Sequence, residues 1–567
     1  MSNNLQNSEK IPIPSLKRYL NKEEFQNYLM LVKAIANFEP NSKKWYLDEY
    51  KISGISKDEL KEIVKELSKY VGDEIYNILS GYLKNDSNTI YAEFRGNYLI
   101  VYDDLEKYKD LLTYKIRTFD HVSGQYIETP ILLAWQKAWQ NSHGFSTLRG
   151  LYWKLSNLAN FRIKPFTNLQ FHDITLKNFE MRDYQISSIK SWISDVNITG
   201  NGVVKAPTGS GKSVIAILAS LEMLKNKSNS KIIYAVNSTT LLKQFQNFAK
   251  KEDLPFILVS GEIDELQKGQ KSDFIALSIS YYYSKKKRNE YEKLKELIRN
   301  ADLIILDEAH HTPANMIKSL LLDSPNSLRL GLSATPLRED GRELEILGFL
   351  GKISYSINYD ELVKNNYLVP LEYIQFTPKI SEKIRNKLKA IEQSYTEEPF
   401  AKFYSVVLRL FENSPYTNSQ IIEKIKELDK YPALVIVRRI AIAKKLSELL
   451  NENGIKSDWV SSKTPLEERM AKIENLKNGK LKILVATSLA DEGLDIPQLS
   501  LVVLISQGKS KIKLIQRIGR VMRPYSGKTK GYVLDIAYGY DIFQRQASKR
   551  IKFISSEYNG IISIKQI

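Results

Sequence analysis

The sequence predicts an α/β protein with two doubly wound parallel sheets, a helical segment between them and an α+β region ahead of both. Short, nearly continuous apolar runs indicate strands that are buried on both faces, as in a parallel sheet. The segments between these runs have helical periodicity, for example residues 212–224. This alternation stops near residue 353 and returns at "PALVIVRR", which indicates two α/β domains instead of one.

The two α/β domains are expected at residues 171–356 and 414–567, because 567 residues are too many for one hydrophobic core. Residues 357–413 are mostly amphipathic helix, so we expect a helical insertion there that adds no strand to a sheet. Residues 1–170 are expected to form an α+β region, with a β-hairpin in "NTIYAEFRGNYLIVYDD". The apolar runs of the first domain are "GVVK", "KIIYAVN", "PFILVS", "FIALSIS", "ADLIILD" and "LRLGLSA", and those of the second are "PALVIVRR", "LKILVAT", "LSLVVLIS" and "KGYVLDIA".

The composition is basic and lacks cysteine. The 83 Lys and Arg residues outnumber the 65 Asp and Glu residues, which gives a formal net charge of +18. Such an excess favours a polyanionic partner such as a nucleic acid, although a merely basic soluble protein would have the same balance. The absence of cysteine excludes disulfides, cysteine-bound zinc and iron–sulfur clusters. With five histidines, we do not expect a metal site built from histidine.

No part of the sequence suggests membrane contact. No apolar run approaches the roughly 20 residues that a bilayer-spanning helix needs, and the start, "MSNNLQNSEK", is polar. We therefore expect a cytoplasmic protein, with the nucleus as the alternative compartment.

The stretch "VVKAPTGSGKS" nearly matches the phosphate-binding loop G-x-x-x-x-G-K-[ST]. It follows a predicted strand and begins a predicted helix, so its backbone N–H groups can converge on phosphate oxygens. Lys212 is expected to reach the β- and γ-phosphates of ATP, and the Ser213 hydroxyl is expected to bind Mg²⁺. The predicted nucleotide-binding residues of the loop are Ala206, Pro207, Thr208, Gly209, Ser210, Gly211, Lys212 and Ser213.

Ala206 stands where the loop pattern has its first glycine. A methyl group is tolerable there if the backbone φ stays negative, because only a positive φ requires glycine. A glycine-rich turn of an unrelated α/β fold is the alternative interpretation of the whole stretch.

The run "LIILDEAHH" ends a predicted buried strand with an acidic pair. A carboxylate at the carboxyl end of such a strand lies where nucleotide-bound Mg²⁺ is held, so Asp307 is predicted to bind the metal together with Ser213. Glu308 is then in position to orient and deprotonate the attacking water. A solvated strand end is the alternative, but it does not account for a pair that closes a buried run. His310, two residues on, is either a coupling residue or a hydrogen-bonded turn histidine.

Together with "GLSATP" and "QRIGRVMRP", these motifs occur in an order that resembles superfamily 2 helicases and translocases. The resemblance covers residues 179–524 and implies two tandem RecA-like motor domains that hydrolyse ATP between them. In that family the loop is A-x-x-G-x-G-K-[ST], so alanine at position 206 is the expected residue.

The resemblance also implies further contacts to the nucleotide. In "FEMRDYQ", Gln185 would bind the adenine edge, with Arg182 nearby. In "VATSLADEGLDIP", Gly493 and Asp495 would lie at the nucleotide cleft.

Arg520 and Arg523 would face the γ-phosphate from the second domain as arginine fingers, each worth on the order of 10³-fold in turnover. Gln516 would bridge to His310 and respond to domain closure. Two residues of "GLSATP" would couple hydrolysis to movement, namely Ser333 and Thr335.

Other segments resemble nucleic-acid contacts of this family. Asn237 in "VNSTTLLKQ" and Thr487 in the second domain would contact the DNA backbone. The triplet Arg338, Glu339 and Asp340 resembles the RED motif of XPB-like helicases, although an exposed loop of mixed charge is the alternative. In XPB-like proteins a thumb-like element that grips DNA occupies the place of the helical insertion, and a damage-recognition module occupies the place of residues 1–170. That N-terminal region also resembles, faintly, the module ahead of UvsW-type helicases.

We therefore expect an ATP-dependent DNA helicase or translocase that moves 3′ to 5′ on single-stranded, forked or duplex DNA, with a partner in repair or transcription. One alternative is the duplex-translocating motor of a restriction or defence system, which would need a nuclease partner. Another is an ATP-switched DNA-remodelling factor with little strand separation. RNA stays open as a substrate, because contacts to the backbone read little base identity.

Overall fold

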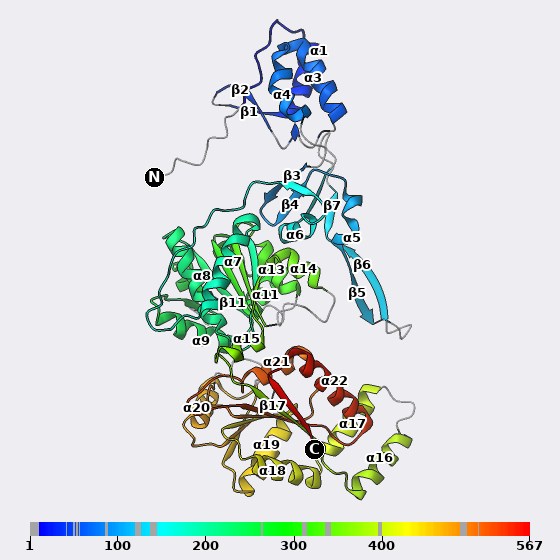
Figure 1. The fold of residues 1–567 in the computed structure, drawn as a ribbon, viewed down its shortest axis with the longest axis vertical. Coiled ribbons are helices and arrows are strands. Elements are labelled where there is room, and N and C mark those ends of the chain that lie inside the picture. Colours follow the sequence, from blue (N-terminus) through cyan, green and yellow to red (C-terminus); the bar gives the residue numbers. More distant parts are fainter. Residues whose placement is uncertain are drawn as a thin grey trace.

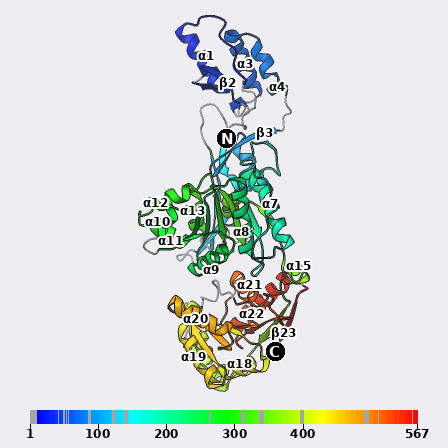
Figure 2. The same ribbon diagram turned by 90° about the vertical axis from the view of Figure 1, so that its left-hand side faces the viewer.

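The computed structural model describes residues 11–567 except 41, 49–50, 53–54, 56, 85–88, 120–125, 137–143, 262–264, 309–313, 335–341, 395–399, 488–495, 509 and 559. Along the long axis of the molecule, a small N-terminal helical unit is followed by the first large sheet and then by the second (Figure 1, Figure 2). None of the helices in the described part of the chain is both long and apolar enough to span a bilayer.

The first large sheet is parallel throughout. Its strands are β10 (Asn201–Lys205), β11 (Ile232–Val236), β12 (Ile257–Val259), β13 (Phe274–Ser278), β14 (Leu303–Asp307), β15 (Leu328–Ser333) and β16 (Ile353–Ser356). They lie in the order β12-β13-β11-β14-β15-β10-β16, and each neighbouring pair is parallel. Its helices are α7 (Asp183–Thr199), α8 (Lys212–Asn226), α9 (Thr239–Lys250), α10 (Glu265–Gln270), α11 (Ile279–Lys287), α12 (Glu292–Arg299), α13 (Ala314–Leu322) and α14 (Glu343–Leu350).

The apolar runs of the sequence explain this sheet. Every residue of β11, β14 and β15 is buried, because helices cover both faces (Figure 1). All six predicted strands are present, and the non-consecutive strand order confirms the doubly wound arrangement.

The second large sheet is also seven-stranded and parallel throughout. Its strands are β17 (Leu371–Phe376), β18 (Ala433–Ile436), β19 (Ser457–Val460), β20 (Ile483–Ala486), β21 (Leu501–Leu504), β22 (Gly531–Ile536) and β23 (Ile562–Gln566). They lie in the order β19-β20-β18-β21-β22-β17-β23, again with parallel neighbours. The accompanying helices are α15 (Tyr359–Lys364), α16 (Glu382–Ser394), α17 (Phe400–Glu412), α18 (Pro415–Leu428), α19 (Ile440–Glu452), α20 (Leu466–Lys477), α21 (Lys511–Gly519) and α22 (Asp541–Glu557).

The structure corrects the boundary of the helical insertion. β17 lies inside the range 357–413 and pairs with β22 and β23, so part of that range belongs to the second sheet. Its sequence, "LEYIQF", contains Glu372 and Gln375, which interrupt the apolar pattern although both are buried. Glu372 is satisfied by an ion pair with Lys565 at 2.7 Å. The helical insertion itself is α16 and α17.

The N-terminal region contains two units with different cores. In the first, α1 (Lys22–Ile35), β1 (Ala36–Glu39), β2 (Lys44–Leu47), α3 (Lys57–Val71) and α4 (Glu74–Lys84) pack around a cluster of their own. The second consists of β3 (Thr89–Arg95), β4 (Tyr98–Val101), η1 (Leu105–Lys107), α5 (Lys109–Leu112), β5 (Thr113–Phe119), β6 (Tyr126–Leu132), β7 (Ala134–Gln136), β8 (Phe145–Leu148), η2 (Arg149–Leu151), α6 (Tyr152–Leu155) and β9 (Asn160–Arg162).

The second unit, which we call the N-terminal sheet unit, shares its core with the first large sheet. Phe145 and Leu148 belong to the same buried cluster as Val203 and Phe349. Its strands lie in the order β7-β8-β4-β3-β9, while β5 and β6 form a separate two-stranded hairpin. The predicted hairpin is confirmed, since β3 and β4 are antiparallel with Arg95 opposite Tyr98.

Candidate functional site

The glycine-rich loop joins β10 to α8, as the sequence predicts for a phosphate-binding loop. Gly209 and Gly211 have φ values of +87° and +86°, which residues with a Cβ rarely adopt. Ala206 is fully buried and is not among the described residues with a positive φ, so a methyl group fits at the first position of the loop. Its backbone N–H donates to the carbonyl of Ser333 at 2.9 Å, which ties the start of the loop to the end of β15.

Three neighbouring strands bring the predicted site residues together. β14, β15 and β10 are adjacent in the sheet, and Asp307, Ser333 and the loop follow one another at their carboxyl ends. This is the edge where parallel α/β sheets bind ligands. The Lys212 ammonium lies 3.0 Å from Glu308 Oε1, so the loop lysine and the acidic pair form one cluster.

Asp307 is buried and held by two donors. Its carboxylate accepts from the Tyr234 hydroxyl at 2.6 Å and from the Glu308 backbone N–H at 2.8 Å. Burial, helped by the charge of Glu308 and opposed by Lys212, raises the pKa of Asp307 to about 6. A nearby cation would favour the ionised form of this carboxylate.

Glu308 has a φ of +49°, an uncommon backbone conformation for a residue other than glycine. Such strain is typical of residues whose side chain must point in a required direction. Here the direction is toward both Lys212 and Gln516, whose Nε2 lies 3.4 Å from Glu308 Oε2. Gln516 belongs to α21 of the second sheet, so Glu308 is contacted from both halves of the molecule.

Other residues of the second half also reach the loop. A Cβ built on Gly209 would lie 3.2 Å from Cγ of Arg523, and one built on Gly519 would lie 2.7 Å from Cβ of Thr208. Arg520, which follows α21, is 5% exposed. The carboxyl end of α21 therefore packs directly on the glycine-rich loop, and Figure 1 shows α21 on the side of the second sheet that faces the first.

Gln185 and Arg182 lie against the same loop. Gln185 Oε1 accepts from the Arg182 backbone N–H at 3.0 Å, and its Nε2 donates to the carbonyls of Ser210 and Gly211, both at 3.4 Å. The Arg182 guanidinium lies over the ring of Tyr367, 4.5 Å from the centroid. In this conformation the amide of Gln185 is engaged with the loop backbone.

The polar groups of the loop fit a phosphate. Thr208 Oγ1 and Ser210 Oγ are buried and have no hydrogen-bond partner among the described residues. Buried hydroxyls without a partner are costly, and phosphate oxygens would satisfy them. The described residues contain no cluster of three or more His, Asp or Glu side chains that could hold a metal. A cation here would therefore take Asp307 and Ser213 and depend on phosphate oxygens for further ligands, as Mg²⁺ commonly does.

The remaining predicted residues divide into two groups. Asn237, just past β11, accepts a hydrogen bond from Ser280, and Thr487, just past β20, is 4% exposed. Gln516 contacts Glu308, and its predicted bridge to His310 stays a prediction because His310 lies outside the described residues. Several predicted residues lie outside the described part of the chain, namely His310, Thr335, Arg338, Glu339, Asp340, Gly493 and Asp495.

Three tyrosines at this site were not predicted. Tyr234 is the donor to Asp307, and the Tyr184 hydroxyl donates to the carbonyl of Ser210. Tyr367 packs near Tyr184, with ring centroids 5.7 Å apart. A hydroxyl inside the apolar run "KIIYAVN" was a signal for Tyr234, because a buried phenol needs a partner.

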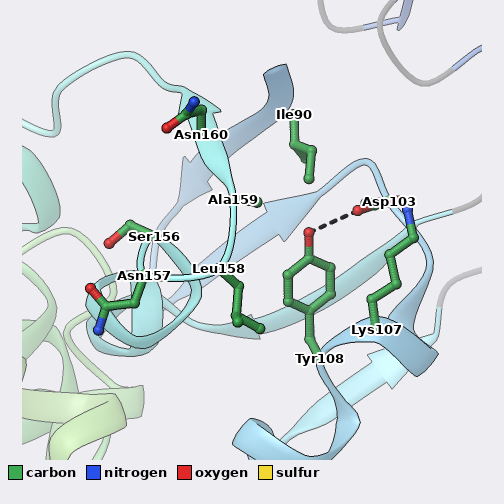
Figure 3. A pocket seen from close by; sticks show the side chains of 9 residues that line it. All are labelled: Ile90, Asp103, Lys107, Tyr108, Ser156, Asn157, Leu158, Ala159 and Asn160. Atoms are coloured by element: carbon green, nitrogen blue, oxygen red, sulfur yellow. Dashed lines mark hydrogen bonds and ion pairs between the residues drawn. The ribbon is translucent and has the colours of Figure 1, made fainter. Parts of the chain in front are cut away.

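Another cavity, of about 600 Å³, lies in the N-terminal sheet unit (Figure 3). Tyr108 donates to Asp103 at 2.7 Å on one side of it, and Leu158 lies on the other side. Lys107 pairs with the second oxygen of Asp103, also at 2.7 Å. The charged groups that line this cavity thus neutralise each other, and its chemistry does not indicate a phosphate site.

Two sequence families match separate parts of the chain. Residues 178–338 match the family described as type III restriction enzyme, res subunit, and residues 417–525 match the helicase conserved C-terminal domain. The first match contains strands β10 to β15 of the first large sheet, and the second contains β18 to β21 of the second.

Individual relatives match over longer stretches. A protein provisionally named helicase 22, from Sulfolobus islandicus filamentous virus (isolate Iceland/Hveragerdi), is 68% identical over 559 residues, which is 99% of each chain. The DNA 3′-5′ translocase XPB2 of Sulfurisphaera tokodaii is 26% identical over 376 residues, which is 61% of this chain and 79% of that relative. Among solved structures, T4 UvsW covers 84% of this chain and 99% of its own, with a TM-score of 0.38 and 16% identity.

Proposed function

This chain belongs to the superfamily 2 helicases, and we propose that it is an ATP-dependent, XPB-like DNA helicase or translocase that moves 3′ to 5′. The observation that carries the proposal is the contact of both halves of the molecule with one glutamate. Glu308 lies 3.0 Å from Lys212 of the first RecA-like domain and 3.4 Å from Gln516 of the second. A reaction centred on Glu308 would therefore respond to the relative position of the two domains.

The first domain supplies the groups for binding and activation. Lys212 and the loop N–H groups would hold the β- and γ-phosphates, while Ser213 and Asp307 would hold Mg²⁺. Bound Mg²⁺ would neutralise charge that develops on the phosphates. Glu308 would orient a water molecule and take its proton.

The second domain would complete the site. Arg523 packs against Gly209, so its guanidinium needs only a small movement to reach a γ-phosphate held in the loop. Arg520 and Arg523 would stabilise the charge of the transition state, and loss of the γ-phosphate would release the domains from each other. Gln185 would hydrogen-bond to the adenine edge after its amide releases the carbonyls of Ser210 and Gly211. Arg182 and Tyr367 would line the pocket next to the adenine.

DNA would be held along both domains. Asn237 and Thr487 stand past the ends of β11 and β20, where each domain can contact a backbone. The triplet 338–340 and the α16–α17 thumb would add contacts of the XPB type. The 3′-to-5′ direction is supported by the relative XPB2, whose name states it, and a role in repair or transcription by the XPB-like resemblance.

ATP hydrolysis with different nucleic acids tests the proposal. We expect stimulation by single-stranded, duplex or forked DNA but not by RNA, together with unwinding of a fork that carries a 3′ tail. Lys212→Ala should lose hydrolysis, while the exposed Lys480→Ala should not. Hydrolysis that survives in Lys212→Ala would contradict the site, and equal stimulation by RNA would contradict the DNA preference.

A second candidate is a motor that translocates on duplex DNA without opening it, as a restriction or defence system would use. The match of residues 178–338 to the type III restriction enzyme family favours it. Displacement of a triplex-forming strand without fork unwinding would select this candidate. A pull-down with a nuclease subunit would then be the next experiment.

A further inference from the structure

Residues 357–370 connect β16 of the first large sheet to β17 of the second, and they lie against the glycine-rich loop. The backbone N–H of Ile357 donates at 3.0 Å to the carbonyl of Lys205, the last residue of β10 before the loop. Further along, Leu368 Cδ2 lies 3.4 Å from the position of a Cβ built on Gly209. Both views show α15, the helix of this connection, between the two sheets (Figure 1, Figure 2). The connection is therefore part of the surroundings of the candidate nucleotide site.

The first residue of α15, Tyr359, carries a buried hydroxyl at this place. Tyr359 is 4% exposed, and its hydroxyl forms no hydrogen bond of normal geometry with any residue in the described part of the chain. Burial raises its pKa, while the hydroxyl of Tyr558 and the backbone N–H of Thr208 act in the opposite direction. These two groups are thus polar neighbours of the Tyr359 hydroxyl. A buried hydroxyl without a partner is costly, so a rearrangement that supplies one is favourable.

Tyr558 brings a second hydroxyl of the same kind from the second RecA-like domain. It lies between α22 and β23, is fully buried, and its hydroxyl likewise has no partner among the described residues. Its ring packs on that of Tyr359, with centroids 4.4 Å apart and planes inclined by 45°. Burial, together with Tyr359, raises the pKa of Tyr558, so both phenols keep their protons at neutral pH. Each therefore has one proton to donate and can also accept.

Thr208 of the glycine-rich loop provides a third hydroxyl. Its Oγ1 is buried and has no partner within the described part of the chain. Of all the tyrosines that the structure describes, only Tyr359 and Tyr558 have a buried hydroxyl without a partner. These two tyrosines are in contact with each other and adjoin the loop, so the three hydroxyls form one group and not three unrelated defects.

What this group lacks is a final acceptor. Three neighbouring hydroxyls can form a hydrogen-bonded chain, but the last donor of the chain needs an acceptor outside it. The oxygens of a bound polyphosphate are acceptors, and one of them can receive the hydrogen bond of the Thr208 hydroxyl. The oxygen of Thr208 would then accept from Tyr359, and that of Tyr359 from Tyr558. A charged acceptor at the end of such a chain strengthens the hydrogen bonds along it.

We propose that Tyr359 and Tyr558 are positioning residues of the nucleotide site, and that their hydroxyls complete this chain to a phosphate when ATP is bound. The inference rests on the proposed function and adds two residues to it. Neither tyrosine would touch the nucleotide, because both act through Thr208. The chain would join the glycine-rich loop to the second RecA-like domain by a route separate from the contact of Glu308 with Gln516.

Tyrosine-to-phenylalanine substitutions test the chain, because they remove only the hydroxyl. Tyr359→Phe, Tyr558→Phe and the double variant are compared with wild type. The matched control is Tyr282→Phe, since Tyr282 is also fully buried but its hydroxyl already donates to Asp323 at 2.6 Å. Three quantities are measured: the melting temperature without nucleotide, the affinity for a non-hydrolysable ATP analogue with Mg²⁺, and KM and kcat for DNA-stimulated ATP hydrolysis.

Tyr359→Phe should melt at or above the temperature of wild type, because it removes a buried hydroxyl that has no partner in the free protein. Its affinity for the ATP analogue should fall roughly twofold to tenfold, which is the effect of one hydrogen bond between neutral groups. KM should rise by a similar factor while kcat changes less than twofold, because the lost contact belongs to binding. The control Tyr282→Phe should show the reverse, with a lower melting temperature and unchanged affinity.

The double variant tests whether Tyr558 acts through Tyr359. It should bind the ATP analogue as Tyr359→Phe alone does, because the loss of Tyr359 already breaks the chain. Losses that add up in the double variant would overturn the inference, as would unchanged affinity in Tyr359→Phe. A lower melting temperature of Tyr359→Phe would also overturn it, since the hydroxyl would then already have a partner in the free protein. Wild-type protein that does not bind the ATP analogue would instead refute the proposed function.

Discussion

Gln516 of the second RecA-like domain donates a hydrogen bond from Nε2 to Oε2 of Glu308 in the first, at 3.4 Å. Glu308 also pairs with Lys212 at 3.0 Å and has a positive φ. One carboxylate thus joins the lysine that we propose to bind phosphate to the helix that precedes the two proposed arginine fingers, Arg520 and Arg523. If Glu308 is the general base, as we propose, its position would depend on how the two domains are placed.

Gln516→Ala should slow DNA-stimulated hydrolysis without abolishing ATP binding. A hydrogen bond to a charged group is worth about 1.5–3 kcal/mol, which corresponds to roughly tenfold to hundredfold in rate. Steady-state hydrolysis and titration with a fluorescent ATP analogue measure the two effects, with Lys480→Ala as the control. If the affinity for ATP fell by the same factor as the hydrolysis rate, Gln516 would contribute to ATP binding and not to closure of the two domains.

Arg523→Ala should reduce turnover on the order of 10³-fold, because an arginine finger acts mainly in the transition state. Arg523→Lys should recover little, since a lysine lacks the planar fork that contacts two phosphate oxygens. Single-turnover hydrolysis at saturating ATP separates this loss from weaker binding. If Arg523→Ala kept a turnover within threefold of wild type, Arg523 would not be an arginine finger.

Asp307→Asn should stabilise the protein in the absence of Mg²⁺ while it abolishes hydrolysis. The pKa of Asp307 rises from 3.8 to about 6 on folding, so its ionisation in the native state costs on the order of 3 kcal/mol at pH 7.5. The cost is absent below pH 4, grows as the pH rises through 6 and is constant above. We expect the variant to melt higher than wild type at pH 7.5, with roughly half of the difference left at pH 5.

The exposed Asp541→Asn is the control for this pH series, because its carboxylate pairs only at the surface with Arg545. It should melt with wild type at both pH values. A difference between Asp307→Asn and wild type that grows as the pH falls would contradict the raised pKa.

Much of the candidate site could be predicted because parallel strands end at one edge. The loop after β10 and the acidic pair at the end of β14 can each be recognised in the sequence as polar residues that follow an apolar run. The parallel sheet then places them next to each other. Tyr234 could not be predicted in the same way. Its hydroxyl inside the apolar run of β11 signals that a partner is needed but not which one, because Asp307 lies 73 residues further along the chain.

The strand β17 shows why other parts of the fold were missed. Glu372 and Gln375 break its apolar pattern, and their partners come from β23 at the far end of the chain: Lys565 pairs with Glu372, and Gln566 donates to Gln375 at 2.8 Å. Local periodicity does not reveal such long-range compensation. The division of residues 1–170 into two units was missed for a related reason. The buried residues of the N-terminal sheet unit pack against residues beyond 200, and such distant contacts leave no local pattern in the sequence.

Arg149 explains how that unit is attached to the first motor domain. It is fully buried at the base of the first large sheet and donates to the carbonyls of Gly96, Gly200, Pro325 and Ser327 and to the side chain of Asn201. No carboxylate is among these recorded partners. Burial, together with the charge of the nearby Arg329, lowers the pKa of Arg149. The guanidinium thus joins three separate segments through their backbone oxygens.

Arg149→Met should loosen the N-terminal sheet unit from the motor. The substitution would leave several buried carbonyl oxygens without a donor, which costs about 1–3 kcal/mol of folding free energy each. Removing the buried charge would recover less than this, because the guanidinium is already well hydrogen-bonded. We expect a lower melting temperature and faster trypsin cleavage within residues 163–182, which connect β9 to α7. Arg162→Met is the matched control, because Arg162 is exposed and donates a hydrogen bond to the Tyr91 hydroxyl at 3.0 Å within the N-terminal sheet unit itself. Equal melting and equal cleavage of the two variants would show that apolar packing alone, through residues such as Leu148 against Gly348, holds the unit in place.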